Sequence, residues 1–174
     1  MGILNDIYDR DGREWLPAPR SQTAKIYGDE VTSPNGKYRL IWNKGEHDKN
    51  VPMGIVYLLT EKEVLLKKEI NCPANGMVSD TGTFIIEDHT PWNSERTDLY
   101  IINIKGVILF KRQFHTEIFN RHISHADNIF LCQNFSMPGS FDNNTLTIFD
   151  FEQGVELHPG PAELQQYVDI LKKM

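Results

Sequence analysis

The chain has 174 residues, of which 40% are hydrophobic and 24% are charged, as expected of one globular domain with a substantial core. Its 18 basic and 24 acidic residues give a formal net charge of −6, which argues against nucleic-acid binding, where a basic surface supplies the affinity. No apolar run approaches the roughly 18 residues of a membrane-spanning helix, and the N-terminus lacks a signal-peptide pattern, so we expect no membrane association.

Residues 1–24 mix charged residues with a few apolar ones, namely Trp15, Leu16, Pro17 and Pro19, and show no clear periodicity. We interpret this stretch as an N-terminal arm whose apolar residues dock on the body of the protein. A partly disordered leader is the alternative, because chain ends are often poorly ordered unless they are tied down.

Residues 25–158 alternate short strand patterns with turn signals, which is typical of an all-β domain. The expected strands, in chain order, are Lys25–Thr32, Tyr38–Asn43, Gly54–Leu59, Val64–Ile70, Gly76–Ser79, Thr83–Glu87, Asp98–Asn103, Val107–Phe114, Phe119–Ser124, Asn128–Asn134, Thr145–Asp150 and Val155–His158. They group naturally into three sets of four.

The first two sets share a turn pattern, Ser33–Lys37 in one and Ser79–Gly82 in the other, and a looser version recurs at Ser124–Asn128. Gly36 and Gly82 are 46 positions apart, a spacing within the range of known repeat architectures. The strands that follow these turns are apolar at consecutive positions, so both of their faces must be covered. We therefore predict three repeated four-stranded antiparallel units of about 45 residues that pack face to face.

Two stretches resemble β-propeller repeats of the WD type and the open type. Asn143–Gly154 is similar to the end of a blade's third strand and its turn into the fourth, and Ser33–Tyr38 is similar to a blade's first hairpin turn. The resemblance implies a β-propeller-like architecture, with a β-sandwich as the alternative. Because closed propellers use about 4–8 blades, three units predict capped ends, association between chains, or three sheets wrapped into a less regular arrangement.

Residues 159–174 predict a C-terminal capping helix. Pro161 and Glu163 suit a helix start, and Lys172 and Lys173 suit a helix end. We expect the helix to pack on the last sheet; insertion into a partner or a second copy is the alternative.

Catalytic signatures are absent from the sequence: it contains no phosphate-binding glycine loop, dinucleotide fingerprint, zinc-protease motif or nucleophile elbow. His115, His122 and His125 lie close together in sequence and suggest a metal site, but strand alternation separates their faces. We expect no metal site, no cofactor and no catalytic residue.

The longer connections, residues 44–52, 71–75, 88–97, 115–119 and 135–143, should gather on one rim of the stacked units, opposite the tight turns. Loops on a rigid scaffold often carry binding residues. The binding candidates in these segments are His47, His89, Trp92, Arg96, Phe135 and Phe141. Alternatively, Trp92 and Phe141 only pack beneath their own loops.

The two cysteines, Cys72 and Cys132, form no metal-binding spacing and are too few for a disulfide framework, which indicates a cytoplasmic protein with free thiols. We expect a non-enzymatic protein-interaction or scaffold module that self-associates or docks on a partner protein. The alternatives are a small hydrolase that uses His115, His122 or Asp127, and a sensor domain that binds a small molecule or carbohydrate on Trp92.

Overall fold

The computed structural model describes residues 26–44, 54–89, 96–115, 118–123, 129–134, 146–150 and 153–172. In these ranges the chain forms twelve strands and one helix. The strands make three four-stranded antiparallel sheets, each built from four consecutive strands. The predicted N-terminal arm lies outside the described residues.

Sheet 1 contains β1 (Asp29–Thr32), β2 (Arg39–Asn43), β3 (Gly54–Leu59) and β4 (Val64–Ile70). Sheet 2 contains β5 (Pro73–Val78), β6 (Phe84–His89), β7 (Thr97–Ile102) and β8 (Ile108–Phe114). Sheet 3 contains β9 (Ile118–Ile123), β10 (Ile129–Asn134), β11 (Leu146–Asp150) and β12 (Val155–Leu157). The predicted fold class, three four-stranded units of about 45 residues followed by a helix, is confirmed.

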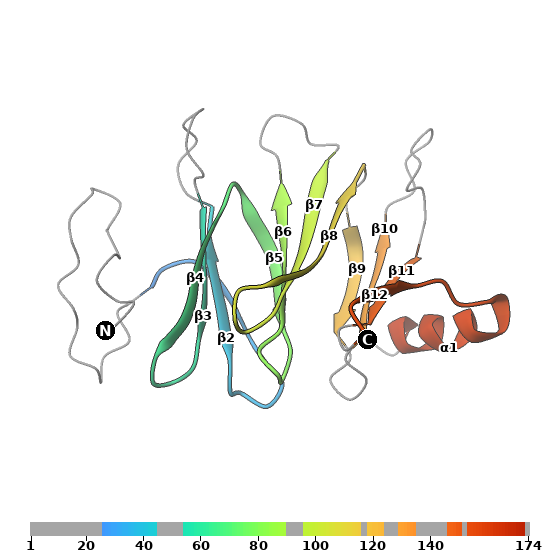
Figure 1. Cartoon of the computed structure of the whole chain (residues 1–174), viewed down its shortest axis with the longest axis horizontal. Helices are drawn as coiled ribbons and strands as arrows, with labels where there is room; N and C mark the ends of the chain where they lie inside the picture. Colours follow the sequence, from blue (N-terminus) through green and yellow to red (C-terminus); the bar gives the residue numbers. More distant parts are fainter. Residues whose placement is uncertain are drawn as a thin grey trace.

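The three sheets stand side by side in a row, and helix α1 (Pro161–Lys172) lies at the end formed by sheet 3, where it contacts β9 (Figure 1). This arrangement fits a propeller-like all-β architecture. Sheet 2 occupies the middle of the row, so both of its faces pack against a neighbouring sheet.

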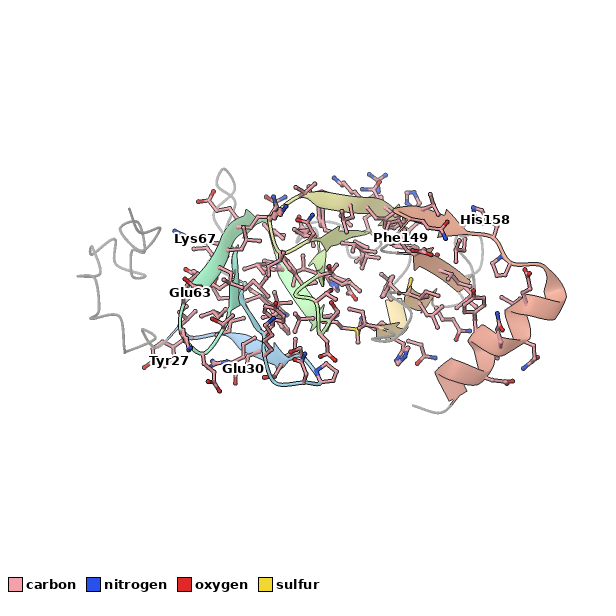
Figure 2. All side chains as sticks on the ribbon, turned by 60° about the horizontal axis from the view of Figure 1, so that its bottom comes forward. Tyr27, Glu30, Glu63, Lys67, Phe149 and His158 are labelled. Atoms are coloured by element: carbon pink, nitrogen blue, oxygen red, sulfur yellow. The ribbon has the colours of Figure 1, made fainter. Side chains whose placement is uncertain are left out.

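Two apolar clusters lie between neighbouring sheets, and their side chains fill the space between the sheets (Figure 2). The cluster between sheets 1 and 2 contains Leu40, Trp42, Val56, Leu58, Val78, Phe84, Ile86 and Ile102. The cluster between sheets 2 and 3 contains Ile85, Leu99, Ile101, Phe114, Ile118, Ile123, Phe130, Cys132 and Phe149. Neighbouring residues of β6 therefore serve opposite clusters, which explains why that strand is apolar at consecutive positions.

The tight turns between first and second strands have the predicted chemistry. Gly36 and Gly82 have φ angles of 73° and 82°, a left-handed conformation that glycine adopts without steric cost. The two turns also meet, because the Asn35 backbone N–H donates to Asp80 Oδ1 over 2.9 Å. Equivalent turns of sheets 1 and 2 therefore lie together on one rim, which we call the tight-turn rim.

The predicted strand limits agree with the structure for β3 and β4 and shift at several others. The expected strand Lys25–Thr32 begins only at Asp29, where pairing with Trp42 begins. The predicted connections 71–75 and 115–119 are too long, since β5 already begins at Pro73 and β9 at Ile118. Proline lacks an N–H donor and is tolerated at the first position of a strand, so Pro73 opens β5.

Candidate functional site

The opposite rim carries the three longest connections, which join β2 to β3, β6 to β7 and β10 to β11, together with the short connections that join one sheet to the next. The strand ends that it brings together are those of β2 and β3, β4 and β5, β6 and β7, β8 and β9, and β10 and β11, all at the upper side of Figure 1. We call this edge the long-connection rim. Two predicted binding residues are described there: His89 ends β6, and the exposed Arg96 directly precedes β7.

A fully buried carboxylate, Glu87, lies two residues from the rim end of β6. An ionised carboxylate away from water is very costly unless it is paired and hydrogen-bonded. Glu87 Oε1 lies 2.6 Å from Arg121 Nε, and Oε2 lies 2.8 Å from His89 Nε2. The Asn75 side-chain amide donates to Oε2 over 2.9 Å. We call Asn75, Glu87, His89 and Arg121 the Glu87 cluster.

The cluster is assembled from three strands of two sheets. Glu87 and His89 are two residues apart on β6, so their side chains share one face. Arg121 comes from β9 of sheet 3. Asn75 sits in a β-bulge of β5 between Ala74 and Met77 and has a φ of 49°, a conformation that asparagine tolerates better than most residues. Bulges of this kind redirect a side chain, and here the amide is directed to Glu87.

Arg121 is held from two directions. Its Nε faces the Glu87 carboxylate at 2.6 Å without hydrogen-bond geometry, so this contact is a charge pair and not a directional hydrogen bond. Its Nη2 donates to the Ile118 carbonyl over 2.7 Å. The side chains of Glu87 and Arg121 are 1% and 21% exposed, so water screens their attraction less than it would at the surface. The pair therefore fixes sheet 3 against sheet 2 near the long-connection rim.

His89 is the part of the cluster that is most open to a ligand, with a side chain that is 39% exposed. Its Nε2 contacts Glu87, and its backbone N–H donates to the Cys72 carbonyl over 3.0 Å. The imidazole is thus positioned through both its ring and its main chain. It can offer its remaining ring nitrogen to a binding partner.

A second carboxylate, Asp88, anchors the connection from sheet 1 to sheet 2. The Cys72 backbone N–H donates to Asp88 Oδ1 over 2.8 Å. Asp88 is buried, and burial raises its pKa, with the charge of Asp98 on the paired strand acting in the same direction. Asp98 is itself paired with Lys111 at 3.1 Å. Asp88 thus links β6 to the connection between β4 and β5, next to the long-connection rim.

Neither cysteine has the environment of a nucleophile. Both thiols are free and buried. Burial raises the pKa of Cys132 to about 12, and burial also raises the pKa of Cys72. Because the thiolate is the reactive form, both residues are poor nucleophiles near neutral pH.

The structure separates the predicted candidates into two groups. His89 belongs to the Glu87 cluster, and Arg96 lies on the same rim outside it. His89 was predicted to lie in a loop; it is instead the last residue of β6, where it pairs with Thr97 of β7. His47, Trp92, Phe135 and Phe141 lie outside the described residues.

The histidine group considered as a metal site is only partly described. His115 is exposed at the end of β8, His122 is half-buried on β9, and His125 lies outside the described residues. In the described part of the chain, no group of three or more His, Cys, Asp and Glu side chains is placed to hold a metal ion. The same part contains no helix long and apolar enough to span a membrane.

Sequence reasoning missed Asn75, Glu87 and Arg121. One signal was available, because Glu87 directly follows the apolar residues Phe84–Ile86 inside a predicted strand. A charged residue at that position lies either at an exposed strand end or in the interior, where it must be paired with other polar or charged groups. The sequence offered no means of identifying the partners, which come from other strands.

The chain matches no protein-family model and no curated protein. Its function must therefore be inferred from the geometry of the long-connection rim and the Glu87 cluster.

Proposed function

We propose that the protein is a non-enzymatic interaction module of propeller-like β architecture that binds a partner protein through its long-connection rim. The observation that supports this proposal is the Glu87 cluster, which fixes residues of sheets 2 and 3 side by side at this rim. A binding surface that is already rigid loses little entropy when a partner docks. The cluster thus provides a preformed base for recognition.

The rim also carries residue types that commonly anchor protein interfaces. Arg96 is exposed beside β7, and arginine is enriched among the residues that contribute most to binding. His89 offers a partly exposed imidazole and pairs across the strands with Thr97, the residue after Arg96. The predicted contacts of His47, Trp92, Phe135 and Phe141 remain part of this proposal.

A hydrolase finds less support in the described residues. The buried carboxylate near the rim, Glu87, has both oxygens engaged by Arg121, His89 and Asn75, so it is poorly placed to accept a proton from a substrate. The raised pKa values of Cys72 and Cys132 argue against cysteine nucleophiles.

Site-specific photo-crosslinking tests the proposal. The photoreactive residue p-benzoylphenylalanine would replace Arg96 on the long-connection rim or Lys105, an exposed residue in the tight turn between β7 and β8. In extracts of cells that express the protein, we expect a discrete crosslinked partner from position 96 and none from position 105. A product at twice the chain mass of 20.1 kDa would identify the partner as a second copy.

The captured partner must then depend on the rim in a direct binding assay. Arg96→Glu should weaken binding of the purified partner, and Lys105→Glu should leave it unchanged. Equal capture at both positions, or equal affinity of both variants, would refute the rim as the binding surface.

A further inference from the structure

The face of sheet 1 that points away from sheet 2 carries an apolar cluster of its own. We call it the outer face of sheet 1. Its three buried members are Ile41, Tyr57 and Leu59, which are only 2%, 4% and 2% exposed, and Ile26, Ile55 and Val64 pack against them. These residues are as well covered as those of the two inter-sheet cores.

Strand alternation shows that this cluster is separate from the core shared with sheet 2. Leu40 and Trp42 belong to the inter-sheet cluster, so Ile41 between them points to the opposite face. Tyr57 stands opposite Ile41 in the sheet register and points the same way. Sheet 1 is the first sheet of the row, and none of the other described sheets lies on this side (Figure 1). The cover must therefore come from elsewhere.

The chain itself leads to this face. Ile26, the first described residue, packs on the cluster, and 25 residues precede it. Fully extended, such a segment could span about 80 Å, several times the length of a six-residue strand of about 20 Å. The segment also carries suitable apolar residues: Ile3, Leu4, Ile7, Trp15 and Leu16.

Arg39 Nε, a buried polar atom on the same face, also indicates that a further segment covers this face. Arg39 is two residues from Ile41 on β2 and therefore shares its face. Its guanidinium pairs with Glu30 at 2.8 Å through Nη2, but its Nε is buried and has no hydrogen-bond partner among the described residues. Buried donors are nearly always satisfied, so an acceptor is expected from a covering segment.

We propose that residues 1–25 of this chain occupy the outer face of sheet 1 as an intramolecular cap. The cap covers Ile41, Tyr57 and Leu59 and supplies an acceptor to Arg39 Nε. It takes the position that the next sheet would have in a longer stack, so the row ends at sheet 1 without a second copy of the chain. This surface is distinct from the long-connection rim, and the proposal does not depend on the proposed function.

Two neighbouring lysines of β4 provide a matched test. Lys67 stands opposite Tyr57 and so belongs to the outer face, whereas Lys68 stands opposite Val56 of the inter-sheet core and belongs to the other face. Figure 2 shows Lys67 at the sheet 1 end of the molecule. In the full chain, p-benzoylphenylalanine would replace either residue, and crosslinked peptides would be identified by mass spectrometry after irradiation.

We expect position 67 to crosslink to a peptide within residues 1–25 of the same chain, with a yield that does not change on dilution. Position 68 should give no such product. A crosslink from position 67 to a second copy, to another part of the chain, or to nothing would overturn the proposal.

A substitution in the segment itself tests the contact without truncating the chain. Leu16→Asp should lower the crosslink yield from position 67 several-fold and increase the fluorescence of a dye that binds apolar surface. Ser21→Asp, which adds the same charge without removing an apolar side chain, should do neither. Equal effects of the two substitutions would show that the contact is not apolar docking.

Discussion

Arg121→Met is the substitution that best tests how sheet 3 is fixed to sheet 2. It keeps most of the apolar stem of the side chain and removes the charge that lies 2.6 Å from the buried Glu87 carboxylate. Removal of one partner from a buried ion pair typically costs about 3–5 kcal/mol. Arg121 is 21% exposed and Glu87 keeps its contacts with His89 and Asn75, so the low end applies, about 3 kcal/mol.

Urea unfolding, followed by circular dichroism and tryptophan fluorescence, measures this loss. With a denaturant slope of about 2 kcal/mol/M, the midpoint should fall by about 1.5 M. Arg96→Met is the control, because Arg96 is exposed and surface substitutions usually change stability by no more than about 0.5 kcal/mol.

The double substitution Glu87→Leu with Arg121→Met distinguishes two causes of the loss. One is the lost attraction between the two side chains, and the other is the cost of leaving the Glu87 carboxylate buried without its cationic partner. Replacing both members of a buried pair by apolar residues is often neutral or stabilising. We therefore expect the double variant to recover most of the loss seen in Arg121→Met. The reasoning is refuted if Arg121→Met costs no more than Arg96→Met, or if the double variant is no more stable than the single one.

Three further predictions concern buried groups. Burial raises the pKa of Asp88, so the ionised carboxylate is less stable in the folded chain than in the unfolded chain. The free energy of unfolding therefore falls as the pH rises from the ordinary aspartate pKa through the raised pKa of the folded chain. Asp88→Asn keeps an acceptor for the Cys72 N–H and should raise the urea midpoint at pH 7, with no gain below the ordinary aspartate pKa. With its pKa raised to about 12, the Cys132 thiol should not react with a thiol reagent at pH 8 until urea unfolds the chain. Gly54→Ala would place a Cβ 2.1 Å from Pro73 Cδ and should destabilise the fold by about 1–3 kcal/mol, measured by the same urea titration.

The architecture could be predicted because it depends on signals local in sequence. Turn glycines such as Gly36 and Gly82 mark the hairpins, and consecutive apolar residues such as Phe84–Ile86 indicate coverage on both faces. The predicted strand limits were wrong where pairing with another strand decides at which residue a strand begins. β5 begins at Pro73 because Pro73 and Ala74 pair with Asp88 and Glu87. No local sequence pattern indicates this pairing.

The candidate site was far less predictable. The expected positions His89 and Arg96 were correctly assigned to one rim, because alternating strand direction decides which ends share an edge. The Glu87 cluster was missed because its members depend on how one sheet is placed against the next. Arg121 reaches Glu87 only through that placement, and Asn75 reaches it only through a bulge with a left-handed residue.

The polar contacts that join the sheets differ in strength, and this difference bears on where a partner should bind. Sheets 1 and 2 meet at the tight-turn rim through the exposed hydrogen bond from Asn35 to Asp80, which water can replace at little cost. Sheets 2 and 3 meet through two ion pairs, Glu87 with Arg121 and Arg112 with Glu156, and because the Glu87 carboxylate is fully buried, water screens its pair much less. A partner that spans sheets 2 and 3 at the long-connection rim would therefore meet a surface whose two halves are already fixed. Since ordering flexible groups costs affinity, the proposed function places the tightest partner contacts on this part of the rim.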